Sequence, residues 1–139
     1  MSKENLNDIK GKISFEDYRV LEINYKLNTD FTSNEPLPIS LDISHNCQIF
    51  EDSMSVKMGV VIFKDSEEKG YPFEMKVEIE GMFSFEGDVD GEKFLANALA
   101  ILYPYIRAIV SSYTSLANIP ALILPTINTH QYLKENENK

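Results

Sequence analysis

Two histidines and a single cysteine are the residue types in this sequence that most often serve in nucleophilic catalysis or zinc binding. His45 and Cys47 lie two positions apart, so on a strand they would share one face, where an imidazole could activate a thiolate. We favour the simpler interpretation of a small thiol beside a polar residue at a strand end. A zinc site would need His45, Cys47, His130 and a carboxylate from distant segments, without the paired spacing of known zinc sites. We therefore expect no catalytic residue, no metal and no cofactor, and a protein that is not an enzyme.

An acidic cluster follows later in the chain, at Asp88, Asp90 and Glu92. It contains part of a calcium-loop pattern, but the ordered spacing and the distal bidentate glutamate are missing. The same acids are favourable at the positive end of a helix dipole, so we interpret them as a helix start near Gly91. Neither common glycine-rich phosphate-binding spacing occurs, and nucleotide binding has no support.

The composition describes one acidic domain. The chain has 139 residues, with 13 Lys and Arg against 22 Asp and Glu, and a formal net charge of −9. An acidic surface repels phosphate, so nucleic acid is not an expected partner. Residues 1–10 lack the apolar stretch of a signal peptide and a lone cysteine forms no intrachain disulfide, so we expect a cytoplasmic protein. We assign residues 1–133 to the domain and 134–139 to a mobile polar tail.

The first two-thirds of the chain predicts strands, because apolar residues alternate with polar ones. The runs are 18–27, 39–43, 54–63 and 73–80. The alternation slips by one near Leu21, which predicts a β-bulge. A charged turn ending at Gly70 predicts an antiparallel hairpin of the last two runs. Pro36 and Pro38 forbid a central strand, so the chain is expected to cross the sheet between the first two runs.

Helical spacing of apolar residues replaces the alternation from about Gly91 onward. Pro104 is expected to break or kink this helix, unless a second helix begins there. Asn97, Pro104 and Arg107 interrupt the apolar stretch 94–110, so we expect no membrane insertion. The proline-flanked run 119–125 predicts an extended or short buried segment, and 128–133 a last helical turn. Strands followed by helices predict an α+β fold, with the helices on one side of an antiparallel sheet.

Methionine and aromatic residues are abundant on or beside the strands. A plain sheet core is the better interpretation of any single methionine, although methionine also adapts its shape to many partners. Apolar residues occupy both faces of the strands at Val61, Phe63, Phe83 and Phe85. This is more apolar surface than a single sheet with two short helices can easily bury. This surplus indicates oligomer contacts, a binding groove, or both.

Three motifs, in order, resemble the SecB family of export chaperones. Residues 73–77 followed by 81–87 are similar to its last strand and "IFS" segment, 102–107 (LYPYIR) to its "LFPYAR" helix signature, and 124–128 (LPTIN) to its "LAPVNF" segment. Residues 39–43 fit the second strand less distinctively. The resemblance covers about residues 38–133.

The resemblance implies a four-stranded antiparallel sheet followed by C-terminal helices that pack on one face. It also implies a homotetramer, built as a dimer of dimers, that binds unfolded, extended polypeptides in apolar surface grooves without ATP and delivers preproteins to the motor SecA. Carried over by position, the groove residues are Ile39, Leu41, Ile43, Phe73, Met75, Val77, Phe83 and Leu124. The implied oligomer interface is the helix face with Tyr105, Ile109 and Tyr113.

Departures from the family concern the acidic surface that docks SecA. Lys76 stands where strand four of the family is acidic. The first strand can be aligned to the family in two ways. Alignment on Arg19 and Val20 puts Asn24 and Asn28 where the family has acidic residues. Alignment on residues 13–16 instead leaves too long a segment before the next strand. Chaperone function survives these departures better than motor docking does. The alternative is a dedicated chaperone of one client, such as an antitoxin in a toxin-antitoxin system.

Overall fold

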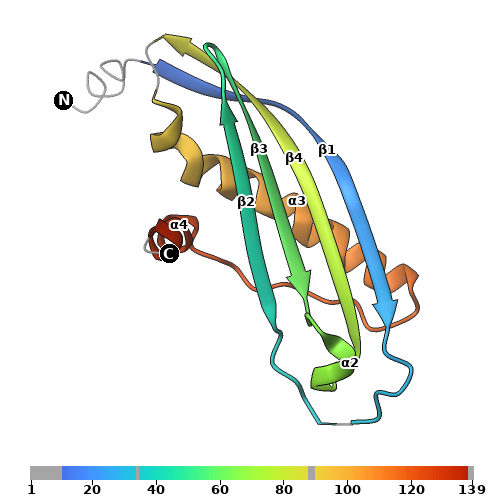
Figure 1. The fold of residues 1–139 in the computed structure, drawn as a ribbon. Coiled ribbons are helices and arrows are strands. Elements are labelled where there is room, and N and C mark those ends of the chain that lie inside the picture. Colours follow the sequence, from blue (N-terminus) through green and yellow to red (C-terminus); the bar gives the residue numbers. More distant parts are fainter. Residues whose placement is uncertain (1–10, 34, 88–89, 138–139) are drawn as a thin grey trace, which may run out of the picture.

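A single four-stranded antiparallel sheet forms the centre of the protein (Figure 1). The computed structural model describes residues 11–33, 35–87 and 90–137. The strands are β1 (Gly11–Leu27), β2 (Leu41–Ile49), β3 (Ser53–Ile62) and β4 (Phe73–Gly87). The helical elements are α2 (Ser66–Lys69), the 3-10 turn η1 (Gly91–Phe94), α3 (Leu95–Leu116) and α4 (Thr129–Glu137). The predicted α+β order of strands and then C-terminal helices is confirmed.

The strand order β1-β4-β3-β2 places two consecutive strands, β1 and β2, at opposite edges of the sheet. The prediction that the chain crosses the sheet between these two strands is therefore correct, and Figure 1 shows the connecting segment below the sheet. Asn28 anchors its start: the buried side-chain amide donates to the Tyr71 carbonyl at 2.9 Å, and the backbone N–H donates to Pro72 at 3.0 Å. The predicted hairpin of the last two runs is also present, because β3 and β4 pair antiparallel on either side of α2.

Strands β1 and β4 are longer than their sequence patterns predict. Gly11 pairs with Gly87 and Phe15 with Phe83, so the aromatic segment 81–87 continues β4. The register between the strands shifts at Phe15/Asp17 and again at Val20/Glu22. The second shift confirms the bulge predicted near Leu21. The first was missed because the pattern before Tyr18 alternates weakly.

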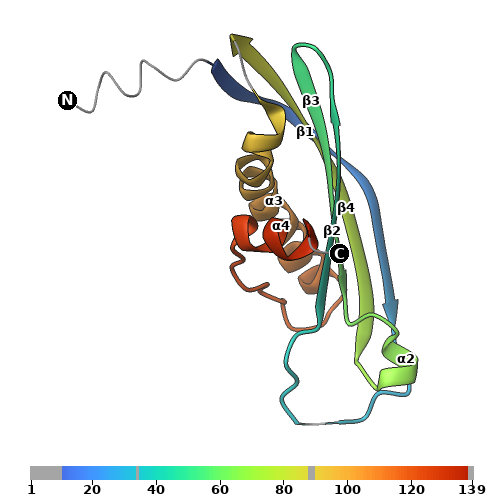
Figure 2. The same cartoon turned by 60° about the vertical axis from the view of Figure 1, so that its left-hand side comes forward.

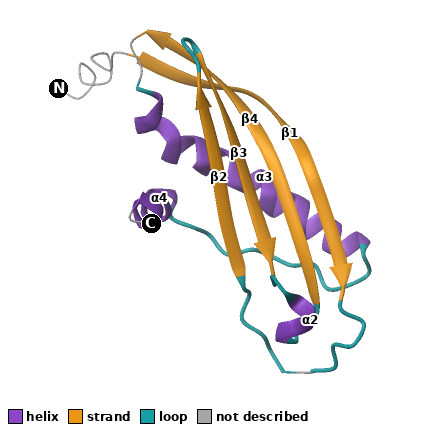
Figure 3. Cartoon of the chain, viewed as in Figure 1, coloured by secondary structure: helices purple, strands orange, loops and turns teal. Residues whose placement is uncertain are grey.

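Helix α3 lies across one face of the sheet (Figures 2 and 3). It runs without interruption through Pro104, so the expected break at this residue is wrong. Pro104 and Ala100, whose carbonyl loses its helical partner, are both exposed, and water can satisfy that carbonyl. By length and composition alone α3 could cross a membrane, but its apolar stripe packs on the sheet, as core helices of globular proteins do.

The core lies between α3 and the inner face of the sheet. Met54, Met58 and Met75 are completely buried there, which confirms a core role for these three methionines. Gly81 allows the closest approach, because a Cβ at this position would lie 2.6 Å from Cδ2 of Leu102. Buried alternate residues of β3 and β4 therefore hold α3 at a fixed distance from the sheet.

The segment between the last two helices is extended, as predicted, and side chains of α3 fasten it. Thr114 Oγ1 accepts the Leu122 N–H at 2.9 Å, and the Tyr103 hydroxyl donates to the Pro125 carbonyl at 2.6 Å. Burial raises the pKa of Tyr103, an effect that Arg107 partly offsets. Helix α4 continues to Glu137, so residues 134–137 are helical rather than part of a separate tail, and 138–139 lie outside the described residues.

Candidate functional site

An apolar groove runs between edge strand β1 and helix α3. It encloses a cavity of about 330 Å³, with Tyr18 and Ile23 on the strand side. The three predicted interface residues line the helix side: Tyr105, Ile109 and Tyr113. Tyr105 stacks on Tyr18 with ring centroids 4.2 Å apart. We call this surface the α3–β1 groove.

The rim of the α3–β1 groove is apolar and open to solvent. Ile23 of β1 and Leu116 at the end of α3, which both line the groove, are 40% and 85% exposed, and Val20 and Leu27 elsewhere on β1 are 45% and 48% exposed. Apolar groups gathered at one place on a protein surface commonly mark an interaction site. The sequence pattern indicated a surplus of apolar residues and placed it on both faces of the sheet. In the structure, the exposed apolar residues of this surface lie along β1 and α3.

The groove residues implied by the family resemblance fall into two sets. Ile39, Leu41 and Ile43 are partly buried at the β2 edge, where solvent reaches them. The other five side chains are buried in the hydrophobic core: Phe73, Met75, Val77, Phe83 and Leu124. In this conformation these five contact their own chain, and client binding at any of the eight stays a prediction.

A hydrogen bond between β2 and α4 was not anticipated from the sequence. The Tyr132 hydroxyl lies 2.7 Å from Nδ1 of His45, and the two rings meet edge to face at 5.3 Å. The hydroxyl also reaches the Ile43 carbonyl at 3.4 Å. Burial lowers the pKa of His45 and raises the pKa of Tyr132, so both groups favour their neutral forms. Nδ1 of His45 thus bonds a tyrosine of α4, which gives the imidazole a structural role.

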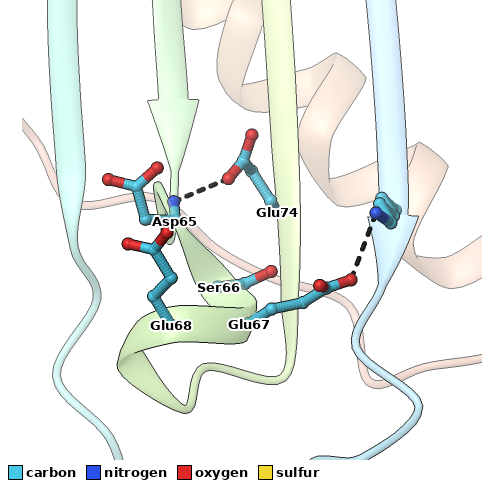
Figure 4. Close-up of a pocket in the computed structure, with 6 residues that line it drawn as sticks. Asp65, Ser66, Glu67, Glu68 and Glu74 are labelled. Carbon is cyan, nitrogen blue, oxygen red and sulfur yellow. Dashed lines mark hydrogen bonds and ion pairs between the residues drawn. The ribbon is translucent and has the colours of Figure 1, made fainter.

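Acidic side chains gather around α2, where they line a cavity of about 230 Å³ (Figure 4). Glu74 accepts the backbone N–H of Asp65 at 2.6 Å, and Glu67 pairs with Lys26 at 3.1 Å. Across residues 11–33, 35–87 and 90–137, no three His, Cys, Asp or Glu side chains come close enough to hold a metal ion. Two residues of the expected acidic helix start, 88–89, lie outside the described residues.

The outer face of the sheet, opposite α3, carries charges that are partly paired. Arg19 binds the carboxylate of Glu80 through both Nε, at 2.8 Å, and a terminal nitrogen, at 2.7 Å. Lys76 lies 3.3 Å from Glu22. Asn28 is buried at the turn after β1, so it lies outside this face. The outer face is thus a mixed surface rather than a uniformly acidic one.

Comparison with known proteins identifies the relatives of this chain. Residues 11–139 match the sequence model of the family SecB, described as preprotein translocase subunit SecB. The uncharacterized protein MJ0357 of Methanocaldococcus jannaschii is 30% identical over 125 residues, which cover 86% of this chain and 81% of the relative.

Two solved structures have a similar fold. The SecB-like chaperone Rv1957 of Mycobacterium tuberculosis, in complex with a ChAD peptide from the antitoxin HigA1 (Rv1956), superposes with a TM-score of 0.67 at 16% identity, covering 88% of this chain and 95% of that one. A protein of unknown function from Streptococcus agalactiae gives a TM-score of 0.54 at 13% identity, covering 84% and 98%. The family match over nearly the whole chain shows that the protein belongs to the SecB family, and the superposition shows that it has the fold of a SecB-like chaperone.

Proposed function

We propose that the protein is a holdase, a chaperone that binds unfolded, extended polypeptides on apolar surfaces and keeps them soluble without ATP. Family membership carries this proposal. The apolar residues Leu41 and Ile43 at the β2 edge, which solvent reaches, support it, because covering apolar surface stabilises a complex by about 25 cal/mol per Å². A net charge of −9 keeps such a surface soluble and attracts basic segments of clients.

The assembly and location belong to the same proposal. We assign the α3–β1 groove, with Tyr105, Ile109 and Tyr113, to contacts between copies of the chain in a homotetramer in the cytoplasm. The accessible β2 residues Leu41 and Ile43 then remain for clients. Delivery to SecA is the less supported part, because Lys76 and Arg19 neutralise acids on the outer face.

The holdase is tested with an aggregating protein. Purified chain in molar excess is mixed with a chemically denatured protein as the denaturant is diluted, in buffer without nucleotide, and light scattering follows aggregation. We expect the scattering to be suppressed in proportion to the chain added. Aggregation that proceeds unchanged at molar excess would contradict the proposal, and serum albumin at equal mass controls for crowding.

A dedicated client is the second candidate, and the antitoxin peptide bound to Rv1957 favours it. Affinity capture from native lysate of the source organism separates the two. A broad set of unfolded precursors supports a general chaperone, and one dominant partner supports a dedicated one. Capture of the motor itself would support delivery to SecA.

A further inference from the structure

The two edges of the sheet differ in how well they are protected against pairing with another strand. Edge strand β1 has two register shifts and carries the cations Lys12, Arg19 and Lys26. Bulges and charged side chains are the devices with which natural sheets prevent pairing at an edge. Edge strand β2 is less protected, since its register with β3 continues unbroken from Leu41 to Ile49, it contains no Lys, Arg or Pro, and its one carboxylate is Asp42.

The hydrogen-bond pattern shows which backbone groups of β2 face outward. Ser40 accepts the Phe63 N–H at 2.9 Å, and Phe50 donates to Ser53 at 2.8 Å. In an antiparallel pair, alternate residues exchange these bonds, so the even-numbered residues of β2 pair with β3. The N–H and C=O groups of Leu41, Ile43, His45 and Ile49 therefore point away from the sheet. The Tyr132 hydroxyl reaches the Ile43 carbonyl from that side at 3.4 Å, which agrees with this assignment.

The side chains of edge strand β2 also alternate between an apolar inner face and a polar outer face of the sheet. Leu41 and Ile43 face the core side and are partly buried, whereas Asp42, Ser44 and Asn46 face outward and are exposed. A further strand in register would meet an apolar neighbour and a polar neighbour at alternate positions. The apolar side chains of the added strand would extend the inner apolar layer of the sheet next to Tyr132 of α4, which packs against the core.

The charges around the β2 edge determine which kind of strand can bind there. Residues 41–52 contain Asp42, Glu51 and Asp52 and no Lys or Arg. All three acids are exposed. The edge therefore favours a neutral or basic strand and disfavours an acidic one.

We propose that strand β2 binds an extended client segment by strand addition, so that an alternating, neutral-to-basic stretch of the client becomes a fifth strand of the sheet. This inference rests on the proposed function and specifies how the client is held. Backbone bonds supply affinity for any sequence, which suits a chaperone of many clients, and the alternating inner side chains add selectivity. The client takes the Ile43 carbonyl from Tyr132, whose hydroxyl keeps Nδ1 of His45 as its partner.

Backbone methylation of a synthetic peptide tests strand addition directly. The probe is about as long as β2, alternates isoleucine and threonine, and has lysine at both ends. Two further versions carry N-methyl groups on alternate backbone nitrogens, one version on each edge of the peptide. They have the same side chains and the same number of methyl groups, so each is the control for the other.

Strand addition predicts that one methylated peptide loses at least about tenfold in affinity while the other binds like the parent, as measured by fluorescence anisotropy. Equal binding by the two versions, or equal loss, would overturn the inference. Parent-peptide binding together with suppression of aggregation tests the proposed function separately, so failure of the one is distinguishable from failure of the other.

A pair of variants tests the same contact from the protein side. Ile43→Pro removes an outward N–H at an edge position, where proline is compatible with a sheet, and Ile43→Ala is its matched control because it also removes the isoleucine side chain. We expect Ile43→Pro to bind the parent peptide at least about tenfold more weakly than Ile43→Ala. Equal affinities in the folded variants would contradict strand addition, and the methylated peptides decide the question if Ile43→Pro does not fold.

Discussion

The Tyr132 hydroxyl and Nδ1 of His45, 2.7 Å apart, join the C-terminal helix to the edge strand of the sheet. Thr129 Oγ1 adds a second attachment, donating to the carbonyl of Ala96 at 2.9 Å from the first turn of α4. Helix α4 is short, and its exposed outer side contributes little burial. Its position beside β2 thus depends on a few specific contacts.

Removing the hydroxyl should loosen this attachment. We expect Tyr132→Phe to lower the free energy of unfolding by about 1 kcal/mol, because a partly buried imidazole nitrogen loses its partner while the ring is kept. Thermal or urea unfolding measures the change. Tyr71→Phe is the control, since within the described residues the Tyr71 hydroxyl makes no hydrogen bond. Equal effects of the two substitutions would argue against a role for the His45 bond.

Stability should also depend on pH through His45. Burial lowers its pKa below the ordinary 6.5 in the folded protein, so the unfolded chain binds the proton more readily. This contribution is fully present above about pH 6.5 and is lost as the pH falls through the folded pKa. Unfolding free energies between about pH 7.5 and 5.5 should therefore decrease less for His45→Gln than for the wild type. The same slope in both proteins would exclude His45 as the titrating group.

Gly81 should tolerate no larger residue beneath α3. Gly81→Ala places a methyl group 2.6 Å from Cδ2 of the fully buried Leu102, so the Leu102 side chain or α3 must shift, and we expect a loss of about 1–3 kcal/mol in unfolding free energy. In Gly59→Ala the new methyl group would lie 3.1 Å from Ser44 Oγ, an exposed side chain that can rotate away. Denaturant unfolding of both variants measures the difference. A larger loss for Gly59→Ala would contradict the close packing at Gly81.

The α3–β1 groove should hold copies of the chain together. Leu116 is 85% exposed in the single chain, so Leu116→Glu leaves the fold intact but buries an unpaired charge in the assembly. We expect association to weaken by at least about tenfold, which light scattering detects as a lower mass at the same concentration. Ile123→Glu, at a residue that is 63% exposed and lies outside the groove, is the matched control. A wild-type protein that is monomeric would contradict the assembly itself.

The local pattern of the sequence was sufficient for much of the fold. Alternation located the four strands, and the slip at Leu21 marked a bulge, because both depend on neighbouring residues only. The expected break at Pro104 was wrong, since local preference could not reveal that Ala100 and Pro104 face solvent on a helix held by its opposite side. The aromatic stretch 81–87 was not assigned to a strand because its partner in β1 is distant in sequence.

The candidate site was less accessible to sequence reasoning. Tyr105, Ile109 and Tyr113 were chosen from one helix stripe and do share one groove. The contact between His45 and Tyr132 joins residues 87 positions apart, and neither is unusual in its local pattern. Burial of Met75 or Phe83 likewise depends on where α3 lies, which no local pattern contains.

The pairing of β1 with β4 has a consequence for how the chain folds. Strands β2, β3 and β4 are consecutive hairpin neighbours and can associate early. Strand β1 pairs with the distant β4, Leu27 with Phe73 and Gly11 with Gly87, so it can join the sheet only after β4 is in place. Closing so long a loop is slow, so addition of β1 is expected to limit the folding rate. On the ribosome β1 emerges before the other strands and cannot pair until β4 has been made. During synthesis the segment from Val20 to Leu27 therefore stays unpaired and exposes apolar side chains until β4 is available.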